Sequence, residues 1–468
     1  MQLGLAFSDE QVRRIYDRAL EVVETIGLAV DDGDVRARLL AAGGFSARGD
    51  RVVIERQAVE AALAARNAEF GIDLPSPRPA PAAGGMRLSV GTRAGWTVPP
   101  GADDVRPMTT ADVIDGIGML RGLDDPHLEW RTIGTPQDVP APLRTAHAQM
   151  LSCVHAGRPT YLDVSTDRDM AVDLAFHEAM GVPRHLPCHL PSPLRLAGQE
   201  FDLALRWSDR VGEISIGSMP QAGVTAPVSV PGLLIQSAAE MLGANAALRA
   251  LLPGKRITFD LGAHATNFRT GGMVYGSPGA LLVEAARFQV RGWLGCGWGG
   301  GRFMRTHARL PGPQSAADKA AGGMLGALLG CPWVGLGGTI GMDEVWSAEQ
   351  LLLDAEIRRF VTQAAGGFVA DDDAFEIDVI RECADAGDFL ASPDTAGRFR
   401  QLAWDGRLFD YGMLNAWLAS DRRSDRARLT EMAADLTGRD TAPALDDDRR
   451  RAVMAVYERA RRRWRKGR

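Results

Sequence analysis

Apolar residues near the start of the chain recur at the spacing of a single helix face. This face is formed by Ile15, Ala19, Val22 and Val23. Ser8 followed by Gln11 matches a capping box just before it. The pattern that follows predicts a helix over residues 34–42, a short strand over 51–54 and a further helix over 56–66. We therefore predict an N-terminal helical extension over residues 1–73.

A proline-rich segment separates this extension from a regular alternation. Residues 74–85 read LPSPRPAPAAGG, a composition typical of a linker. The short apolar runs after it predict strands near 86–91, 128–134, 160–164, 186–190, 213–218, 256–260, 291–297 and 333–338. The amphipathic stretches between them predict helices over 109–122, 141–156, 167–181, 199–211, 229–251, 278–289, 314–329 and 347–363.

The alternation itself predicts the fold. Strand–helix–strand units give parallel strands joined by right-handed crossovers. Repeated over about 280 residues, such units favour a closed (β/α)8 TIM barrel over an open sheet, and they place it at residues 86–365. Residues 366–468 return to helical patterns without the repeat, so we predict a C-terminal helical extension there.

One glycine-rich stretch lies where such a barrel carries its chemistry, in the loop after the predicted seventh strand. It reads GCGWGGGRFMRTHARLPGPQ over residues 295–314. Because glycine has no Cβ atom, Gly297, Gly299 and Gly300 would let the backbone approach a ligand closely. The alternative is a flexible turn that contacts no ligand.

Aromatic residues gather around the same strand ends. Trp298 and Trp346 are the members best placed for a cage that could hold a quaternary ammonium group, and Phe268, Tyr275 and Phe303 add aromatic surface to it. The alternative for each aromatic residue is packing in the core. We expect the latter for Trp293, which falls in the middle of the predicted seventh strand.

Two titratable residues are candidates for ligand contacts. His307 lies between Arg305 and Arg309, whose charges disfavour its protonated form, so a neutral imidazole could orient a ligand or move a proton. Asp260 ends the predicted sixth strand and, if it points inward, could pair with a cationic substrate. The alternative for His307 is a histidine of a surface loop, and the alternative for Asp260 is a structural ion pair.

Composition narrows the class of protein. The net charge is −6, and the sequence shows no strongly basic face. We therefore expect no nucleic-acid partner. Five dispersed cysteines favour reduced thiols over disulfides and show no zinc-site spacing. No apolar run is long enough to cross a bilayer, and we expect a cytoplasmic protein that binds no membrane. Familiar catalytic and phosphate-binding motifs are absent, which leaves a barrel for a small organic ligand.

Several stretches together resemble the trimethylamine methyltransferase family of corrinoid-dependent methyltransferases. They include SDEQVRRIYDRALEVVETIGLAV at 8–30, GSMPQAGVTAPVSVPGLLIQSAAEMLG at 217–243, LPGPQSAADKA at 310–320 and SAEQLLLDAEI at 347–357. Their order and spacing extend over almost the whole chain. The joint match is specific, although no single stretch is diagnostic.

The resemblance implies a (β/α)8 barrel and a methyltransferase activity. Members move a methyl group from a methylamine, or from a quaternary amine such as glycine betaine, to the cobalt of a corrinoid carried by a separate protein. The founding members carry pyrrolysine in the loop after the seventh strand. His307 falls at or near that position, so the chain resembles a member without pyrrolysine. The implied partners are the corrinoid protein and a small amine, with no directly bound metal and with a homo-oligomer as one possible assembly.

The resemblance also suggests residue roles. His307 and Gln314 would orient the amine head group, and Asp260 would balance its charge beside the aromatic wall. If the substrate is a betaine, Arg305 or Arg309 would bind its carboxylate. The glycines at 297–301 would give clearance to the corrinoid ring.

Two departures from the family pattern open an alternative. Gly279 and Gly312 stand where the family carries acidic residues. Their loss leaves room for a changed substrate. It also leaves room for a barrel that binds a quaternary amine or a corrinoid without turning it over.

Overall fold

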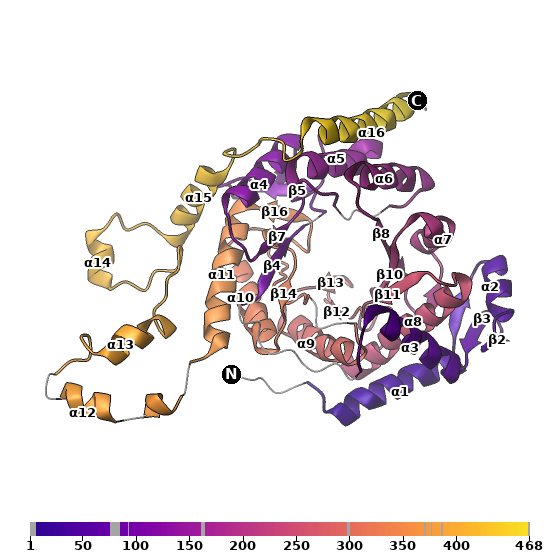
Figure 1. Cartoon of the computed structure of the whole chain (residues 1–468), viewed down its shortest axis with the longest axis horizontal. Coiled ribbons are helices and arrows are strands. Elements are labelled where there is room, and N and C mark those ends of the chain that lie inside the picture. Colours follow the sequence, from indigo (N-terminus) through magenta and orange to yellow (C-terminus); the bar gives the residue numbers. More distant parts are fainter. Residues whose placement is uncertain are drawn as a thin grey trace.

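The fold is described from a computed structural model. It covers residues 6–74, 85–91, 93–160, 164–296, 300–368, 371–375, 377–384 and 387–466. Most of the predicted linker therefore lies outside the described residues. Figure 1 shows helices surrounding a centre toward which the strands gather.

The N-terminal elements follow the sequence prediction closely. They are α1 (Asp9–Thr25), β1 (Leu28–Val30), α2 (Gly33–Leu40), β2 (Phe45–Arg48), β3 (Arg51–Ile54) and α3 (Arg56–Phe70). The predicted capping box is confirmed, because the Ser8 amide donates to Gln11 Oε1 at 2.8 Å and the Gln11 amide donates to Ser8 Oγ at 3.2 Å. β1 pairs with β3 and also, in parallel, with β9 (Arg195–Leu196), so this region joins the body through a shared sheet.

Two arcs of parallel strands form the centre. One has the order β14 (Trp333–Val334), β4 (Arg87–Val90) and β7 (Leu128–Trp130). The other has the order β11 (Arg256–Phe259), β10 (Glu213–Ser218) and β8 (His185–Leu190). The sequence pattern predicts a closed ring of strands. In the structure, no strand pairing within the described residues joins the two arcs. The centre of the predicted third strand, 161–163, lies outside them.

All the helices predicted between the strands are present. They are α4 (Thr110–Gly122), α5 (Arg144–Ala156), α6 (Asp167–Met180), α7 (Gln199–Trp207), α8 (Val230–Leu251), α9 (Pro278–Trp293), α10 (Pro313–Leu328) and α11 (Ala348–Gly366). α8 is apolar around most of its circumference because α1 and α3 cover the side that faces away from the strands.

Short strands and turns of helix complete this part of the chain. β5 (Trp96–Val98), β6 (Arg106–Pro107), β15 (Thr339–Ile340) and β16 (Val345–Ser347) form one sheet, and β12 (Ala265–Thr266) pairs with β13 (Met273–Val274). The 3-10 turns are η1 (Ala141–Leu143) and η2 (Ser208–Arg210).

The prediction of a strand over 291–297 is wrong. Residues 291–293 continue α9, where the Trp293 ring packs on Tyr16 at 5.2 Å between centroids. The place expected for the seventh strand, next to β14, is taken by Gly301 instead. Gly301 pairs in parallel with Val334, and its amide donates to the Trp333 carbonyl at 3.0 Å. A short apolar run fits a helix and a strand equally well, so its tertiary partners decide.

Residues of the second arc alternate between the helices and the interior. Cys188 and Ile214 are buried against the surrounding helices. Their neighbours His189 and Ser215 line a cavity instead, as does Asp260 just after β11. This period of two places polar side chains of the second arc toward the cavity.

The C-terminal region has two parts. The first contains η3 (Asp372–Phe375), α12 (Asp378–Ala384), α13 (Pro393–Arg398), η4 (Phe399–Gln401) and α14 (Leu414–Ala419). Its α-helices bury none of their described residues, and it extends away from the body at the left of Figure 1. The second part, α15 (Asp425–Leu436) and α16 (Asp447–Lys466), returns to the body and buries Leu429, Val453 and Val456.

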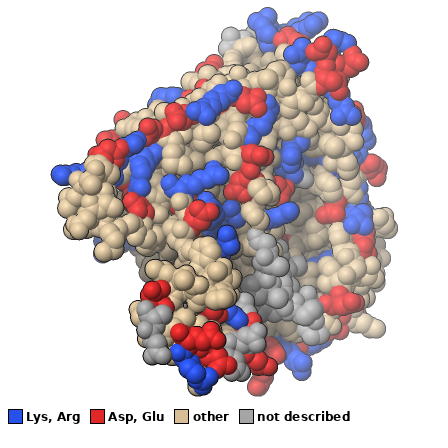
Figure 2. Space-filling view, turned by 60° about the vertical axis from the view of Figure 1, so that its left-hand side comes forward, with Lys and Arg blue, Asp and Glu red and all other residues tan. Residues whose placement is uncertain are grey.

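Acidic and basic side chains are interspersed over the face shown in Figure 2. None of the helices in the described part of the chain combines the length and the apolar character needed to cross a bilayer.

Candidate active site

A cavity of about 570 Å³ is lined by residues from both arcs. Met219 and Asp260 follow β10 and β11 in the second arc, and Gly91 and Arg131 follow β4 and β7 in the first. The cavity therefore lies at the carboxyl ends of parallel strands, where proteins with this strand–helix alternation place their binding sites.

Asp260 is held between two buried arginines. Its Oδ1 atom accepts from Arg291 Nε at 2.8 Å and lies 3.6 Å from Arg287 Nη1. Burial alone would raise the pKa of Asp260, but the two guanidinium groups lower it below the ordinary value. Arg287 also forms a two-pronged pair with Glu284, at 2.6 and 2.8 Å. Asp260 is thus a fixed anion on the cavity wall.

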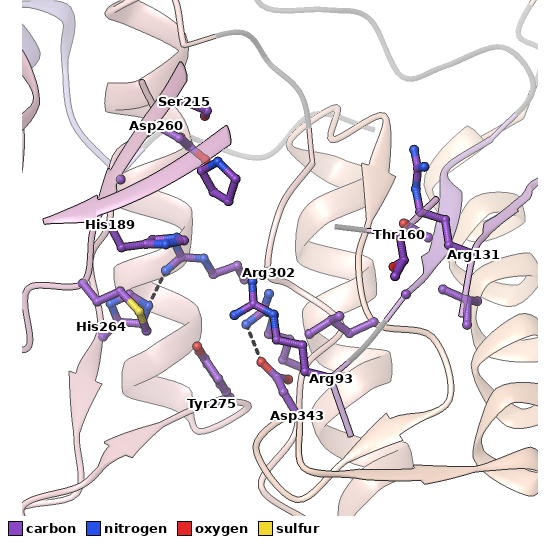
Figure 3. Close-up of a pocket in the computed structure, with 18 of the residues that line it drawn as sticks. Arg93, Arg131, Thr160, His189, Ser215, Asp260, His264, Tyr275, Arg302 and Asp343 are labelled. Carbon is purple, nitrogen blue, oxygen red and sulfur yellow. Dashed lines mark hydrogen bonds and ion pairs between the residues drawn. The ribbon is translucent and has the colours of Figure 1, made fainter. Parts of the chain in front are cut away.

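Arg302 and His264 form a second unit of the wall (Figure 3). The guanidinium group of Arg302 donates to His264 Nε2 at 2.5 Å, and its backbone amide donates to Glu284 Oε1 at 2.8 Å. Burial and the charge of Arg302 hold the pKa of His264 well below its ordinary value. The imidazole is therefore neutral and carries its proton on Nδ1, because Nε2 accepts.

Arg305 lines the cavity beside Tyr275. Its guanidinium group pairs with Asp343 at 2.8 Å and lies 4.9 Å from the centre of the Tyr275 ring. The amide of Tyr275 donates to Nδ1 of His307 at 3.3 Å. His307 is half-buried and does not line the cavity; it supports the aromatic residue that does.

His189 projects from β8 into the cavity and is oriented from behind by Glu200. The Glu200 carboxylate lies 2.9 Å from His189 Nδ1 and accepts the His189 amide at 2.6 Å. Burial raises the pKa of Glu200, but the bonds from His189 outweigh it and lower the value. A carboxylate on Nδ1 turns the Nε2 atom of His189 toward the cavity, where it can exchange a hydrogen bond or a proton with a ligand.

The structure separates the predicted site residues into groups. Asp260 and Arg305 line the cavity, and His307 lies one layer behind. Arg309 and Gln314 are exposed and are not part of the lining. The predictions for Gly297, Trp298 and Gly299 lie outside the described residues.

Two of the proposed cage residues are in the core instead. Phe303 has no exposed surface and packs on Phe288 at 5.6 Å between ring centroids. Trp346 is 5% exposed and belongs to the same hydrophobic cluster. Both side chains point away from the interior, and the aromatic ring that does line the cavity within the described residues, apart from histidine, is that of Tyr275.

Gly300 also has a packing role. A Cβ atom at this position would collide with the Trp333 ring, and its carbonyl accepts from Arg291 Nη1 at 3.1 Å. Gly300 was predicted to follow the seventh strand, but it precedes Gly301, the residue that pairs with β14.

Sequence reasoning missed most of the cationic wall. Arg93, Arg131 and Arg302 line the cavity together with Arg305. The alternation in β8 could have placed His189 inside, because Leu186, Cys188 and Leu190 form its buried face. Arg302 carried no local signal, since the strand that positions it was predicted elsewhere.

Comparison with known proteins identifies the class. The chain matches the model of the family described as "Trimethylamine methyltransferase (MTTB)" over residues 4–464. It is 22% identical over 456 residues to the glycine betaine methyltransferase of Desulfitobacterium hafniense (strain Y51), covering 94% of each chain. It is 23% identical over 472 residues to the trimethylamine methyltransferase MttB of D. hafniense (strain DSM 10664 / DCB-2), covering 97% of this chain and 94% of that one.

The chain is therefore a methyltransferase and belongs to the trimethylamine methyltransferase family, which confirms the resemblance noted in its sequence. Among solved structures it is similar to the monomethylamine methyltransferase MtmB of Methanosarcina barkeri, with 12% identity, a TM-score of 0.41 and coverage of 97% of this chain and 93% of that one.

Proposed function

We propose that this protein transfers a methyl group from an N-methylated amine to the cobalt of a corrinoid carried by a separate protein. The observation that carries the proposal is the polar cavity at the carboxyl ends of the strands, in a chain that matches the methyltransferase family over nearly its whole length. The names of the relatives, which include glycine betaine and trimethylamine methyltransferases, support a small amine as the methyl donor.

The chemistry requires a strong nucleophile, because a methyl group bonded to nitrogen is a poor electrophile. The described lining of the cavity contains neither cysteine nor lysine. Cobalt(I) supplies the electron pair for the new carbon–cobalt bond, and the electrons of the carbon–nitrogen bond leave with the amine. A quaternary ammonium donor leaves as a neutral amine and needs no proton. The task of the protein is then to position the donor and to exclude water.

Residues of this chain would divide that task. The negative charge of Asp260 attracts an ammonium group, and the ring of Tyr275 offers it an aromatic face. The Nε2 atom of His189 can accept a hydrogen bond only from a donor that carries an N–H. His307 keeps a positioning role through its bond with the Tyr275 amide. Gln314 and Arg309, both exposed, have no contact with the cavity in this arrangement.

Apolar side chains beside the cavity support docking of a partner. Val224, Val228 and Phe268 are 55%, 63% and 69% exposed, and they lie in the segments after β10 and β11. Phe268 packs beside Gly223, so the two segments form one surface. An exposed apolar surface next to a site is typical of a protein interface.

We further propose that the two arcs belong to one (β/α)8 barrel over residues 86–365, with helical extensions over 1–73 and 366–468. The parallel pairings and the complete set of predicted helices support this arrangement. We also infer a cytoplasmic protein, because all five cysteines are free thiols.

A homo-oligomer is supported by the projecting part of the C-terminal region. Large apolar side chains are exposed along it, among them Phe375, Leu390, Leu402, Met413 and Leu414. Burial of such a surface between copies would remove it from water. Light scattering after size exclusion measures the assembly, and a monomer at micromolar concentration would contradict this inference.

The proposed activity is tested with the purified protein, a reduced corrinoid protein and a panel of methylamines and betaines. Methyl transfer changes the visible spectrum of cobalt, and we expect this change with at least one donor. A complete absence of transfer across the panel would overturn the proposal. Thermal stabilisation by an amine without transfer would support the alternative, a barrel that binds its ligand without turnover.

A further inference from the structure

The projecting part of the C-terminal region, residues 368–418 and hereafter the C-terminal arm, holds most of the exposed apolar side chains of the described chain. Of the 24 large apolar side chains that are exposed among the described residues, thirteen lie in this arm. Every residue of α14 is exposed, and positions 411–419 contain no charged residue. Apolar surface gathered in this way is typical of an interface with another protein.

The helices of the C-terminal arm are too short to be stable without a packing partner. α12 has seven residues, α13 and α14 have six each, and none of the three has a buried residue. A helix in water needs about 12–15 residues to be even marginally stable by itself, and shorter helices depend on tertiary packing. No described element of the same chain provides this packing for α14.

The apolar area of the C-terminal arm matches that of a stable interface. Six of its exposed side chains are aromatic, with between 40% and 77% of their surface in water: Phe368, Phe375, Phe389, Phe399, Tyr411 and Trp417. These six alone offer roughly 500–900 Å² for burial, and a standard interface takes about 800 Å² from each partner. A methyl-accepting partner has to leave after each transfer, whereas a second copy of the chain is present at all times and can keep this area covered.

A groove between α1 and the start of α8 offers a matching surface. Its volume is about 580 Å³, and its apolar lining consists of Phe7, Ile15, Val22, Ile26, Pro231 and Ile235. Arg14, Arg18 and Glu21 lie beside these apolar residues, and Ile26 is 44% exposed. Apolar residues bordered by polar ones are typical of a protein interface, and a groove between helices is a typical receptor for a short helix.

The C-terminal arm and the groove lie on different sides of one molecule. Figure 1 shows the arm at the left and α1 and α8 at the lower right, with the strands between them. α14 therefore does not reach the groove of its own chain. Its large apolar residues recur four apart, as Met413 with Trp417 and Leu414 with Leu418, so they share one face of the helix.

We propose that α14 of one copy docks in the groove between α1 and α8 of a second copy, with its apolar face against Ile26 and Ile235. This inference goes beyond the proposed reaction and names the surface that receives the arm in the homo-oligomer. Repeated in both directions the contact closes a pair of copies, and repeated in one direction it closes a ring. The groove shares no residue with the cavity, so assembly and methyl transfer can be tested separately.

Light scattering after size exclusion tests the contact with the full chain at micromolar concentration. We expect a mass of at least two chains for the unchanged protein. We expect a mass of one chain for Leu414→Glu, in α14, and for Ile26→Glu, in the groove, because each variant places a charge in the apolar contact. An unchanged protein that is monomeric, or an Ile26→Glu variant that assembles normally, would overturn the inference.

Leu282→Glu, on α9, is the matched control for these variants. Leu282 is 69% exposed, Leu414 is 66% exposed, and Leu282 does not line the groove. We expect this variant to assemble as the unchanged protein does, and its dissociation would show that any added charge disrupts the assembly, which would also overturn the inference. The three substitutions are at exposed positions, and a melting curve verifies that each variant is folded.

Cross-linking between copies identifies the receiving surface directly. Cys383, which lies in the arm, is first replaced by serine, and Leu418→Cys and Ile26→Cys are then introduced into separate chains. We expect a short bismaleimide to join the two chains in an equal mixture, and to join far fewer in either variant alone. A cross-link formed by Leu418→Cys alone would place arm against arm and overturn the assignment.

This inference and the proposed reaction fail in different ways. A monomeric chain that transfers methyl groups would overturn the docking of α14 and leave the methyltransferase proposal intact. An assembled chain with the expected cross-link, but without methyl transfer to any corrinoid protein, would have the reverse result. A monomeric chain whose Leu414→Glu variant binds the corrinoid protein less tightly would assign α14 to that partner and overturn the inference.

Discussion

Two regions of this protein bury charge in different ways: the pair Lys319–Asp354 and a cluster in the cavity wall, hereafter the Arg302 cluster. The cluster consists of Arg287, Arg291, Arg302, Arg305, Glu284, Asp260 and Asp343. Lys319 Nζ lies 2.5 Å from Asp354 Oδ2, and both side chains are fully buried. Asp354 also accepts from the Gly338 amide and from Gln350, each at 2.8 Å. One cation meets one anion there, and neither residue lines the cavity.

The two carboxylates respond oppositely to their surroundings. Burial raises the pKa of Asp354, and the single charge of Lys319 does not offset it. The pKa of Asp260 is lowered instead, because two arginines outweigh its burial. The balanced, enclosed pair has the character of a structural link. The cluster with surplus positive charge beside a cavity has the character of a binding site.

Breaking the enclosed pair should have the largest effect on stability. Lys319→Met leaves Asp354 buried without its counter-ion, and we expect a loss of about 3–5 kcal/mol in the free energy of unfolding. Urea denaturation measures this loss. The double variant Lys319→Met/Asp354→Leu removes both charges and should recover most of it; a double variant as unstable as the single one would show that the charge is not the cause.

Acid should destabilise the protein through histidines that are neutral in the folded state. The pKa of His264 is held well below its ordinary value of about 6.5 in the unfolded chain, so below that pH the unfolded chain takes up a proton that the folded chain refuses. Stability should therefore fall as pH drops below about 6.5, by up to about 1.4 kcal/mol per pH unit for this group.

Burial also lowers the pKa values of His147 and His177. Both residues therefore make stability fall further as the pH drops. Urea denaturation at several pH values between 5 and 7 measures it. His264→Gln should make the slope shallower, and an unchanged slope in this variant would contradict the assignment to His264.

Removal of the surplus charge should change stability little, and in the opposite direction. Arg302→Gln relieves the burial of a cation that forms no ion pair with a described residue, and we expect an unfolding free energy between unchanged and about 1 kcal/mol higher. The same urea experiment compares it with Lys319→Met. A loss as large as that of Lys319→Met would show that Arg302 is a structural residue after all.

Breaking an exposed ion pair should have the smallest effect on the free energy of unfolding. Arg206 and Asp167 lie 2.6 Å apart with about half of each side chain in water. Arg206→Gln should change stability by less than about 0.5 kcal/mol, because solvent screens the pair. A larger change would mean that distance alone, without burial, decides the contribution of a pair in this protein.

The sequence by itself determined the elements whose signal is local. The capping box at Ser8, the helices between the strands and the edges of β3 follow from periodicity and from short-range hydrogen bonds, and the structure has them where they were predicted. The matched stretches also identified the family, because order and spacing along the chain do not depend on coordinates.

Only the tertiary structure decided which side chains meet in the cavity. The run at 291–297 contains too few residues to distinguish helix from strand, and its packing against Tyr16 made it the end of α9. That shift moved the seventh strand position to Gly301, turned Phe303 into the core and placed Arg302 on the cavity wall. Whether a charge is paired depends on segments that are far apart in the chain, so no local pattern could have shown that Arg302 bonds to His264 and forms no ion pair with a described residue.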